Sequence, residues 1–163
     1  MNIRTIISEN NVPKQKSEFA KERCIMGLFT KKKSTDDYAE EGNKLFDEEN
    51  YAKAIQIWLE GLDSLNKPLN EQGEAVWFQT SIADAWFMLG EYEKAYSYLL
   101  DAKSNISGEG YTNPFVMLRL GECLHELGKE DAVEYLMRAY MLAGEEIFES
   151  DDKKYFDLIK YLI

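Results

Sequence analysis

The sequence predicts an all-α protein, an α-solenoid in which about three helix pairs stack in series and a further helix caps the C-terminal end. The main observation is a short polar turn at residues 89–95, which has near-copies at residues 47–54 and 127–132. Each copy separates two amphipathic runs and leads to an Ala, whose small side chain lets the next helix pack closely against the preceding one. Three copies in series indicate a repeat array, and such arrays bind partners through an extended surface.

The composition suits one buried domain, because 45% of the 163 residues are hydrophobic and 30% are charged. No apolar run approaches the ~20 residues that a membrane span needs, and the N-terminus lacks the apolar core of a secretory signal. We therefore expect a cytoplasmic protein without a membrane partner. Cys24 and Cys123 have neither the spacing of metal ligands nor that of a disulfide framework, so both should be reduced.

The formal net charge of -11 is divided unevenly along the chain. Residues 1–34 hold eight Lys or Arg and three Glu, net +5, whereas residues 35–163 have a net charge of -16. The first segment shows no sustained helical or strand period, so we expect a flexible basic leader before a domain over residues 35–163. An acidic domain repels nucleic acid and favours encounter with basic proteins, although acidity can also serve solubility alone.

The first predicted pair begins at Ser34, which has Asp37 three residues later, the pattern of an N-cap with a carboxylate in the first turn. Its second helix runs from Tyr51 to about Leu65 and ends before Pro68, which cannot continue a helical hydrogen-bond ladder. The second pair is expected over residues 70–89 and 92–103, and two glycines at 108 and 110 then indicate a loop.

The third predicted pair begins with Asn113 as N-cap and Pro114 at the first helical position, where its missing N–H costs nothing. Its first helix should end at Leu127, with Gly128 as a left-handed C-terminal residue, and its second covers about residues 131–143. Residues 150–161 then predict a capping helix that starts at Ser150 and presents Phe156 and Ile159 on one face, a face that Leu162 would extend.

These pairs resemble the tetratricopeptide repeat, in which a small residue of the first helix and an Ala of the second recur at fixed spacing. Gly42 precedes Ala54 by twelve residues and Ala83 precedes Ala95 by twelve, while the third spacing, from Gly121 to Ala132, is eleven. The anchor residues recur after 41 and 38 positions instead of the usual ~34. The resemblance therefore implies longer second helices or loops, and a generic helical bundle is the alternative.

In tetratricopeptide arrays the first helices of successive repeats line a concave groove. Carried over onto this sequence, the resemblance implies that a partner binds Asn43, Phe46, Asp47, Trp77, Thr80, Asp84, Phe87, Met88, Phe115, Glu122, His125 and Glu126; it also places Asp36, Ala39 and Leu118 on this side. The alternative for Phe46, Trp77 and Phe87 is burial between helices. The family's carboxylate clamp for acidic chaperone tails is not matched, since Asn43 is its only clamp residue here and Arg119 the only nearby base.

An aromatic and acidic groove favours a basic, partly apolar protein segment. Residues 144–156 also resemble the C-terminal part of short bacterial tetratricopeptide proteins that are encoded beside polymorphic or contact-dependent toxins. That resemblance implies an immunity protein that neutralises a basic toxin, and nuclease toxins are basic because they bind phosphate. The alternatives are a secretion chaperone and a general scaffold or adaptor.

The sequence shows no coherent catalytic or metal-binding set, so we expect neither enzymatic activity nor a cofactor. The single histidine, His125, has Glu122 and Glu126 beside it, but no further ligands follow at a useful spacing. These three residues are better interpreted as groove-lining or solvated polar groups.

Overall fold

The computed structural model describes residues 33–107 and 109–163. The predicted leader lies outside the described residues except for Lys33 and Ser34, and Cys24 lies outside them as well. Within the described ranges all regular elements are helical, which confirms the predicted all-α class. Described by itself, the unit Lys33–Ile163 is one compact body.

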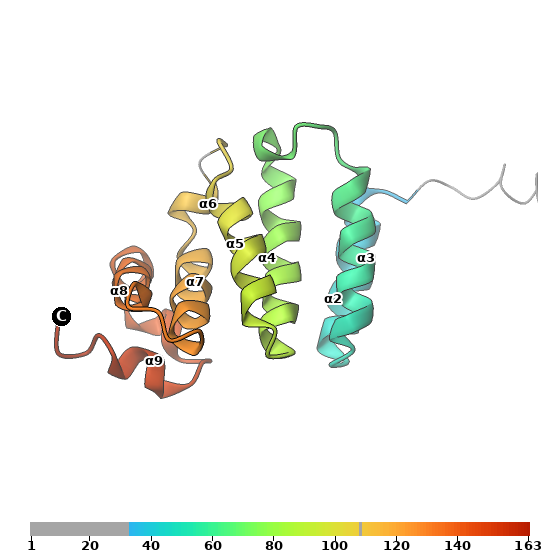
Figure 1. Ribbon diagram of the computed structural model, residues 1–163. Helices are drawn as coiled ribbons and strands as arrows, with labels where there is room; N and C mark the ends of the chain where they lie inside the picture. Colours follow the sequence, from blue (N-terminus) through green and yellow to red (C-terminus); the bar gives the residue numbers. More distant parts are fainter. Residues whose placement is uncertain (1–32, 108) are drawn as a thin grey trace, which may run out of the picture. The chain divides into compact units, whose positions relative to one another are not determined.

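The helices follow one another as an array of three pairs (Figure 1). α2 packs against α3, α4 against α5 and α7 against α8, while α3 contacts α4 and α5 contacts α7. The elements are α2 (Thr35–Asp47), α3 (Tyr51–Ser64), η1 (Leu69–Glu71), α4 (Gly73–Met88), α5 (Tyr92–Lys103), α6 (Glu109–Thr112), α7 (Pro114–Glu126), α8 (Ala132–Ala143), η2 (Glu145–Phe148) and α9 (Lys153–Asp157).

The recurring turn of the sequence is one backbone structure used three times. Glu49, Gly90 and Gly128 all have left-handed φ values, 59°, 74° and 66°. In each turn the N–H of this residue donates to a carbonyl three residues back, and the next N–H donates to a carbonyl five residues back, at 2.8–2.9 Å. This is the Schellman arrangement, which satisfies the last carbonyls of the first helix and reverses the chain.

Two helix starts agree with the sequence prediction because they depend on local hydrogen bonds. The Ser34 side chain accepts from the backbone N–H of Asp37, and the Asp37 carboxylate accepts from the N–H of Ser34, which forms a capping box. The Asn113 side chain accepts from the N–H groups of Phe115 and Val116, with Pro114 at the first helical position.

Two segments between the pairs differ from the prediction. α4 begins at Gly73 and not at residue 70, because the 3₁₀ helix η1 takes up the preceding residues. The predicted glycine loop contains the short helix α6, where a Cβ on Gly110 would lie 1.8 Å from the carbonyl oxygen of Ala102. The close approach of these two backbone segments therefore explains this glycine.

The C-terminal capping helix is shorter than predicted. α9 covers Lys153–Asp157 with Asp152, not Ser150, as its N-cap, and the unpredicted η2 precedes it. Ile159 is fully buried as expected, whereas Leu162 is 61% exposed. Burial of Phe148, Tyr155 and Ile159 fixes this segment against the third pair despite its irregular backbone.

The interior consists of two apolar clusters, one within α3 and α4 and one that joins parts of α4 and α5 to α7, α8 and the C-terminal segment. Trp86 and Tyr98 pack against both clusters, so they link the pairs. Trp58 is 2% exposed, and a Cβ on Gly42 would lie 2.0 Å from its indole nitrogen. The small residue of the repeat thus makes room for the large residue of the next helix.

Candidate functional site

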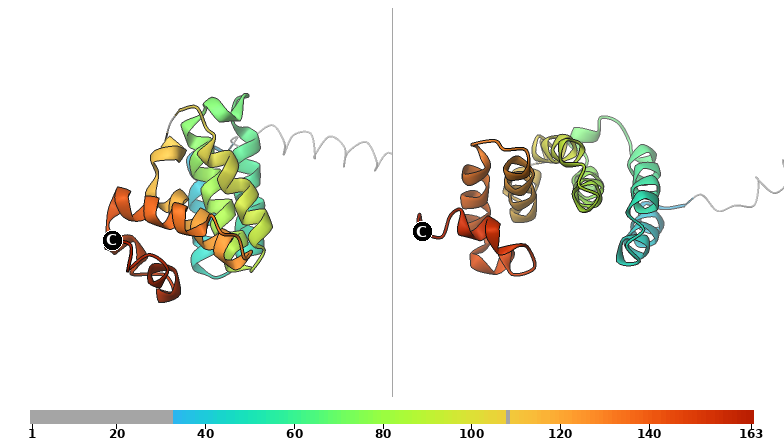
Figure 2. Two further views of the ribbon diagram at one scale, coloured as in Figure 1. Left: turned by 60° about the vertical axis from the view of Figure 1, so that its left-hand side comes forward. Right: turned by 60° about the horizontal axis from the view of Figure 1, so that its bottom comes forward.

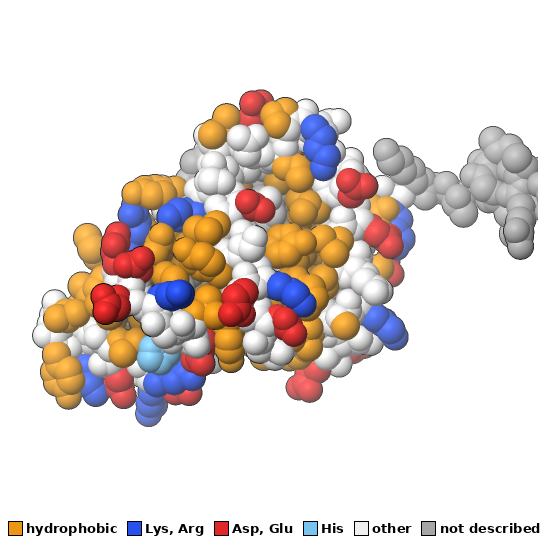
Figure 3. All heavy atoms as spheres, in the orientation of Figure 1, with side chains coloured by type: hydrophobic (Ala, Val, Ile, Leu, Met, Phe, Trp, Pro, Cys, Tyr) orange, Lys and Arg blue, Asp and Glu red, His pale blue; other side chains and the backbone are white. Residues whose placement is uncertain are grey.

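The first helices of the three pairs lie on one side of the array, with α3 and α5 on the other (Figure 2). We call this side the α2–α4–α7 surface and define it by two adjoining pockets. The residues that line them are Thr35, Asp36, Ala39, Gly73, Glu74, Val76, Trp77, Phe78, Thr80, Ser81, Asp84, Asn113 and Phe115. Figure 3 views the array from the side on which α3 and α5 lie, and it shows apolar side chains gathered over the middle of that face, with charged side chains among them.

Trp77 lines both pockets, one of about 350 Å³ between α2 and α4 and one of about 340 Å³ between α4 and the start of α7. Its side chain is 40% exposed, and its buried part contacts the rings of Trp58 and Phe78, at 6.1 and 5.1 Å between centroids. The indole is therefore supported by the core on one side and accessible to solvent on the other. Aromatic side chains with such partial exposure are common among the anchor residues of protein interfaces.

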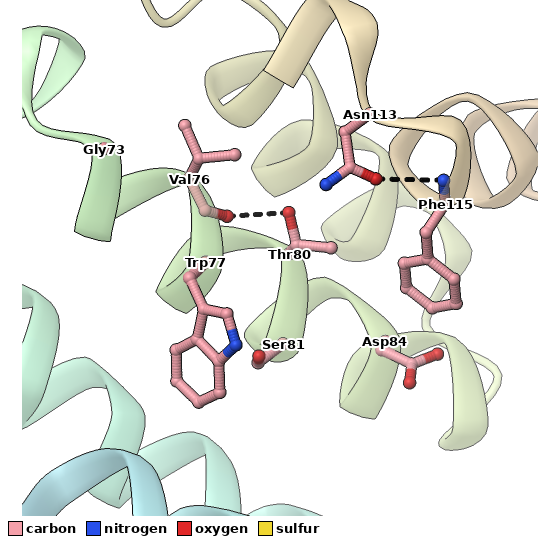
Figure 4. A pocket seen from close by; sticks show the side chains of 8 residues that line it. All are labelled: Gly73, Val76, Trp77, Thr80, Ser81, Asp84, Asn113 and Phe115. Carbon is pink, nitrogen blue, oxygen red and sulfur yellow. Dashed lines mark hydrogen bonds between the residues drawn. The ribbon is translucent and has the colours of Figure 1, made fainter. Parts of the chain in front are cut away.

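The pocket between α4 and α7 brings together four of the predicted groove residues, namely Trp77, Thr80, Asp84 and Phe115 (Figure 4). The Thr80 hydroxyl donates to the carbonyl oxygen of Val76 at 2.7 Å, so its remaining lone pairs can still accept. Ser81 and Asn113 complete the polar lining. The sequence pattern indicates Asn113 only as a helix cap, and the groove positions of the repeat do not include Ser81.

Arg119 occupies the centre of a charge cluster beside this pocket and is 8% exposed. Its Nε donates to Asp84 Oδ1 at 2.7 Å, and its Nη1 donates to Glu122 Oε2 and to Asp151 Oδ1, the latter at 2.7 Å. The guanidinium carbon lies 4.6 Å from the ring centroid of Phe87 and 5.1 Å from that of Phe115. One buried cation is thus held by three carboxylates and two aromatic rings.

Glu122 is fully buried, so the prediction that it lies open to a partner in the groove is wrong. Its Oε1 has no hydrogen-bond partner among the described residues. Burial raises its pKa from 4.5 to about 7, although the charge of Arg119 opposes this rise. Burial likewise raises the pKa of Asp84, again against the attraction of Arg119. Leu118 is also fully buried, because that side of α7 packs into the core.

His125 and Glu126 are covered by the chain's own C-terminal segment. The Tyr155 hydroxyl donates to Glu126 Oε1 at 2.8 Å, and Lys154 Nζ lies 2.7 Å from the same oxygen. The hydrogen bond from Lys154 lowers the pKa of Glu126. The ring of His125 meets that of Tyr155 edge to face, at 5.7 Å between centroids. Lys154 and Tyr155 of the C-terminal segment therefore contact the part of α7 that the sequence predicted to bind a partner.

The remaining predicted residues lie apart from the pocket between α4 and α7. Asn43 and Asp47 are exposed on α2, and Met88 is 48% exposed at the end of α4. Phe46 is half-buried against Tyr51 and Trp58, while Phe87 packs on Tyr92 and on the guanidinium of Arg119. The sequence carried no signal for Asp151, Lys154 or Tyr155 as part of this site, because they reach it only through the fold.

Within the described residues no group of His, Cys, Asp and Glu is arranged to hold a metal ion. None of the described helices is both long and apolar enough to cross a membrane. Cys123 is a buried free cysteine, and burial raises its thiol pKa to about 12.

No protein-family model matches the chain. The chain is 36% identical to the protein-lysine N-methyltransferase SMYD4 of Pongo abelii over 95 residues. The match covers 56% of this chain but only 11% of the length of SMYD4. The fold resembles a solved structure, the first TPR of Spaghetti (RPAP3) bound to the HSP90 peptide SRMEEVD. The TM-score is 0.63 at 22% identity, over 79% of this chain and 93% of that one. The chain thus has the fold of a tetratricopeptide-repeat α-solenoid.

Proposed function

We propose that this chain is a protein-interaction module that binds a basic, partly apolar segment of another protein on the α2–α4–α7 surface. We further propose that the partner is a toxin, which the chain neutralises as an immunity protein in the cytoplasm. The observation that carries the binding proposal is the half-exposed indole of Trp77 between two pockets.

The charge of this surface supports a basic partner. Asp36, Glu74 and Asp84 line the two pockets, and none of the lining residues in the described chain is Lys or Arg. Carboxylates around an accessible aromatic ring steer a cationic segment toward a position where the ring can be desolvated.

An acidic ligand suits this surface poorly. The HSP90 peptide bound by the solved neighbour carries two Glu and one Asp. In the present chain the buried base on this side, Arg119, is already paired with three carboxylates. A further carboxylate would meet a site with an excess of negative charge, so the neighbour's ligand chemistry does not transfer.

The choice of a toxin as partner is supported by the resemblance of residues 144–156 to toxin-associated proteins and by the sign of the charge. In the structure this segment contains η2 and the start of α9, and it holds Asp151 against Arg119. The proposal is tested by co-expressing the chain with the toxin encoded immediately upstream of its gene. Rescue from this toxin and not from an unrelated one supports the role, and the absence of rescue contradicts it.

The binding surface is tested with the same toxin by biolayer interferometry. Trp77→Ala should mainly speed dissociation and cost about 2 kcal/mol of binding free energy, because it removes a central aromatic anchor. Leu59→Ala is the matched control, since Leu59 is 36% exposed on α3. If both variants bind alike, or if Trp77→Ala lowers the melting temperature by many degrees, the indole serves the core and not the partner.

The electrostatic part of the proposal is tested by reversing Asp36 and Glu74 to Lys. This change should slow association and reduce its dependence on salt, because exposed carboxylates act mainly through steering. The control reverses Glu93 and Asp101, two exposed residues of α5, so that the net charge changes by the same amount. Equal association rates for the two double variants would place the partner on another face.

A further inference from the structure

We propose that the pocket between α4 and α7 is a receptor for a single arginine side chain of the partner. This inference rests on the proposed function, because it names the side chain that anchors the basic segment on the α2–α4–α7 surface. The evidence is the combination of aromatic walls, a carboxylate with an unused oxygen and an excess of negative charge in one cavity.

The walls of the pocket suit a planar cation. Trp77 lies on one side of the cavity and Phe115 on the other, with Thr80 and Ser81 between them (Figure 4). Guanidinium groups stack on aromatic faces because the ring quadrupole attracts a weakly hydrated cation. The volume of about 340 Å³ is near the lower end of the range for ligand pockets, which favours one long side chain over a larger ligand.

The polar groups of the pocket are acceptors for the donors of a guanidinium. Asp84 uses only Oδ1 toward Arg119, and within the described chain its Oδ2 has no hydrogen-bond partner. The Thr80 oxygen can also accept, since its own proton is directed to the carbonyl of Val76. Arginine supplies five donors in a fixed fork, whereas lysine supplies a point charge that cannot stack and bridge at once.

The charge balance leaves the pocket attractive to a cation even beside Arg119. Arg119 contacts three carboxylates, so one negative charge remains in excess even when Glu122, whose pKa burial raises to about 7, holds a proton. Opposite charges attract strongly in a partly buried site, where water screens them little.

The chain itself contains an example of the proposed binding mode. Arg119 is held by the Asp84 carboxylate and lies over the rings of Phe87 and Phe115. Two of these three groups, Asp84 and Phe115, also line the pocket. A second guanidinium would thus bind beside the first through groups that already show the required chemistry.

The test uses the full chain and a capped tetrapeptide with one arginine among alanines. Two matched peptides carry lysine or citrulline in place of the arginine. Citrulline has nearly the shape of arginine without its charge. Binding is followed by the NMR shifts of the Trp77 indole N–H and of the Thr80 and Ser81 amides. We expect these signals to move with the arginine peptide and to respond at least about tenfold more weakly to citrulline.

Asp84→Asn should weaken binding of the arginine peptide about tenfold, because the amide can still accept from Arg119 Nε but carries no charge. Asp101→Asn on α5 is the control of equal charge change and should bind as the parent chain does. Ser81→Arg should abolish binding by filling the pocket with its own guanidinium. Equal binding of the citrulline peptide, or arginine-induced shifts confined to η2 and α9, would overturn the proposal.

The outcomes separate this inference from the proposed function. If the arginine peptide fails to bind while Trp77→Ala still weakens toxin binding, the arginine receptor is wrong and the interaction surface stands. If the peptide binds as described but the chain neither binds nor neutralises the upstream toxin, the pocket stands and the immunity role is wrong.

Discussion

Arg119 connects three segments of the chain, because its guanidinium contacts Asp84 of α4, Glu122 of its own helix and Asp151 before α9. A buried guanidinium is costly unless its donors are satisfied, and here its side-chain hydrogen-bond partners among the described residues are carboxylates. The group with an unsatisfied polar atom is Glu122, which is fully buried and whose Oε1 has no hydrogen-bond partner among the described residues. The cluster therefore holds a carboxyl group that is easier to protonate in the folded than in the unfolded chain.

A first prediction follows from the raised pKa of Glu122. Because the folded chain binds this proton more tightly, the stability contributed by Glu122 is fully present below its unfolded pKa of 4.5. It is lost as the pH rises through about 7. Glu122→Gln should flatten this decline by removing the ionisation. Urea unfolding measures the free energy of unfolding across this pH range, with Glu134→Gln at an exposed position as the control. If the free energy of unfolding depends on pH in the same way for the parent chain and for Glu122→Gln, the prediction is refuted.

At the scale of elements, the Schellman turn sets the geometry of each pair. Two of the three copies have Gly at the left-handed position, whereas the first has Glu49. A residue with a Cβ in this conformation costs roughly 1–2 kcal/mol. The turn thus recurs in the backbone even where the sequence lacks the residue that favours it.

The second prediction compares the same turn position in two repeats. Gly90→Ala should destabilise the fold by about 1 kcal/mol, because it introduces a Cβ at a φ of 74° without any contact to compensate. Glu49→Gly should stabilise it by less than about 1 kcal/mol, since the gain in the turn is offset by a more flexible unfolded chain. Urea unfolding measures the stability of both variants. If Gly90→Ala leaves the free energy of unfolding unchanged, the turn relaxes to a conformation that accepts a Cβ.

At the scale of the whole described unit, the C-terminal segment is part of the third pair's core as well as its cover. Ile159 is fully buried and Tyr155 is 4% exposed, while the next apolar residues, Leu162 and Ile163, are 61% and 50% exposed. Because a solenoid contacts only neighbouring repeats, its last pair needs such a cover.

The third prediction tests this role with two aliphatic truncations in the same segment. Ile159→Ala should cost about 2–5 kcal/mol, because it opens a cavity in the core. Leu162→Ala should change stability by less than about 0.5 kcal/mol, since its side chain is mostly in solvent. Thermal unfolding followed by circular dichroism measures both. A similar small effect for the two variants would show that the segment only rests on the surface.

The sequence by itself determined the three pairs, their turns and two of their caps. These features depend on hydrogen bonds within a few residues and on apolar periodicity, as at Ser34, Asn113 and Gly128, so local pattern is sufficient. It also indicated Trp77, Thr80, Asp84 and Phe115 for one surface, because the repeat period places them on successive first helices.

Only the tertiary structure decided which of the predicted groove residues are accessible. The ion pairs of Arg119 with Asp84 and Asp151 join residues 35 and 32 positions apart, and no local pattern encodes them. The same is true of the hydrogen bond from Tyr155 to Glu126, across 29 positions. Helical spacing tells which face a side chain is on, whereas its exposure depends on what packs against that face, and here the chain's own C-terminal segment covers the third repeat.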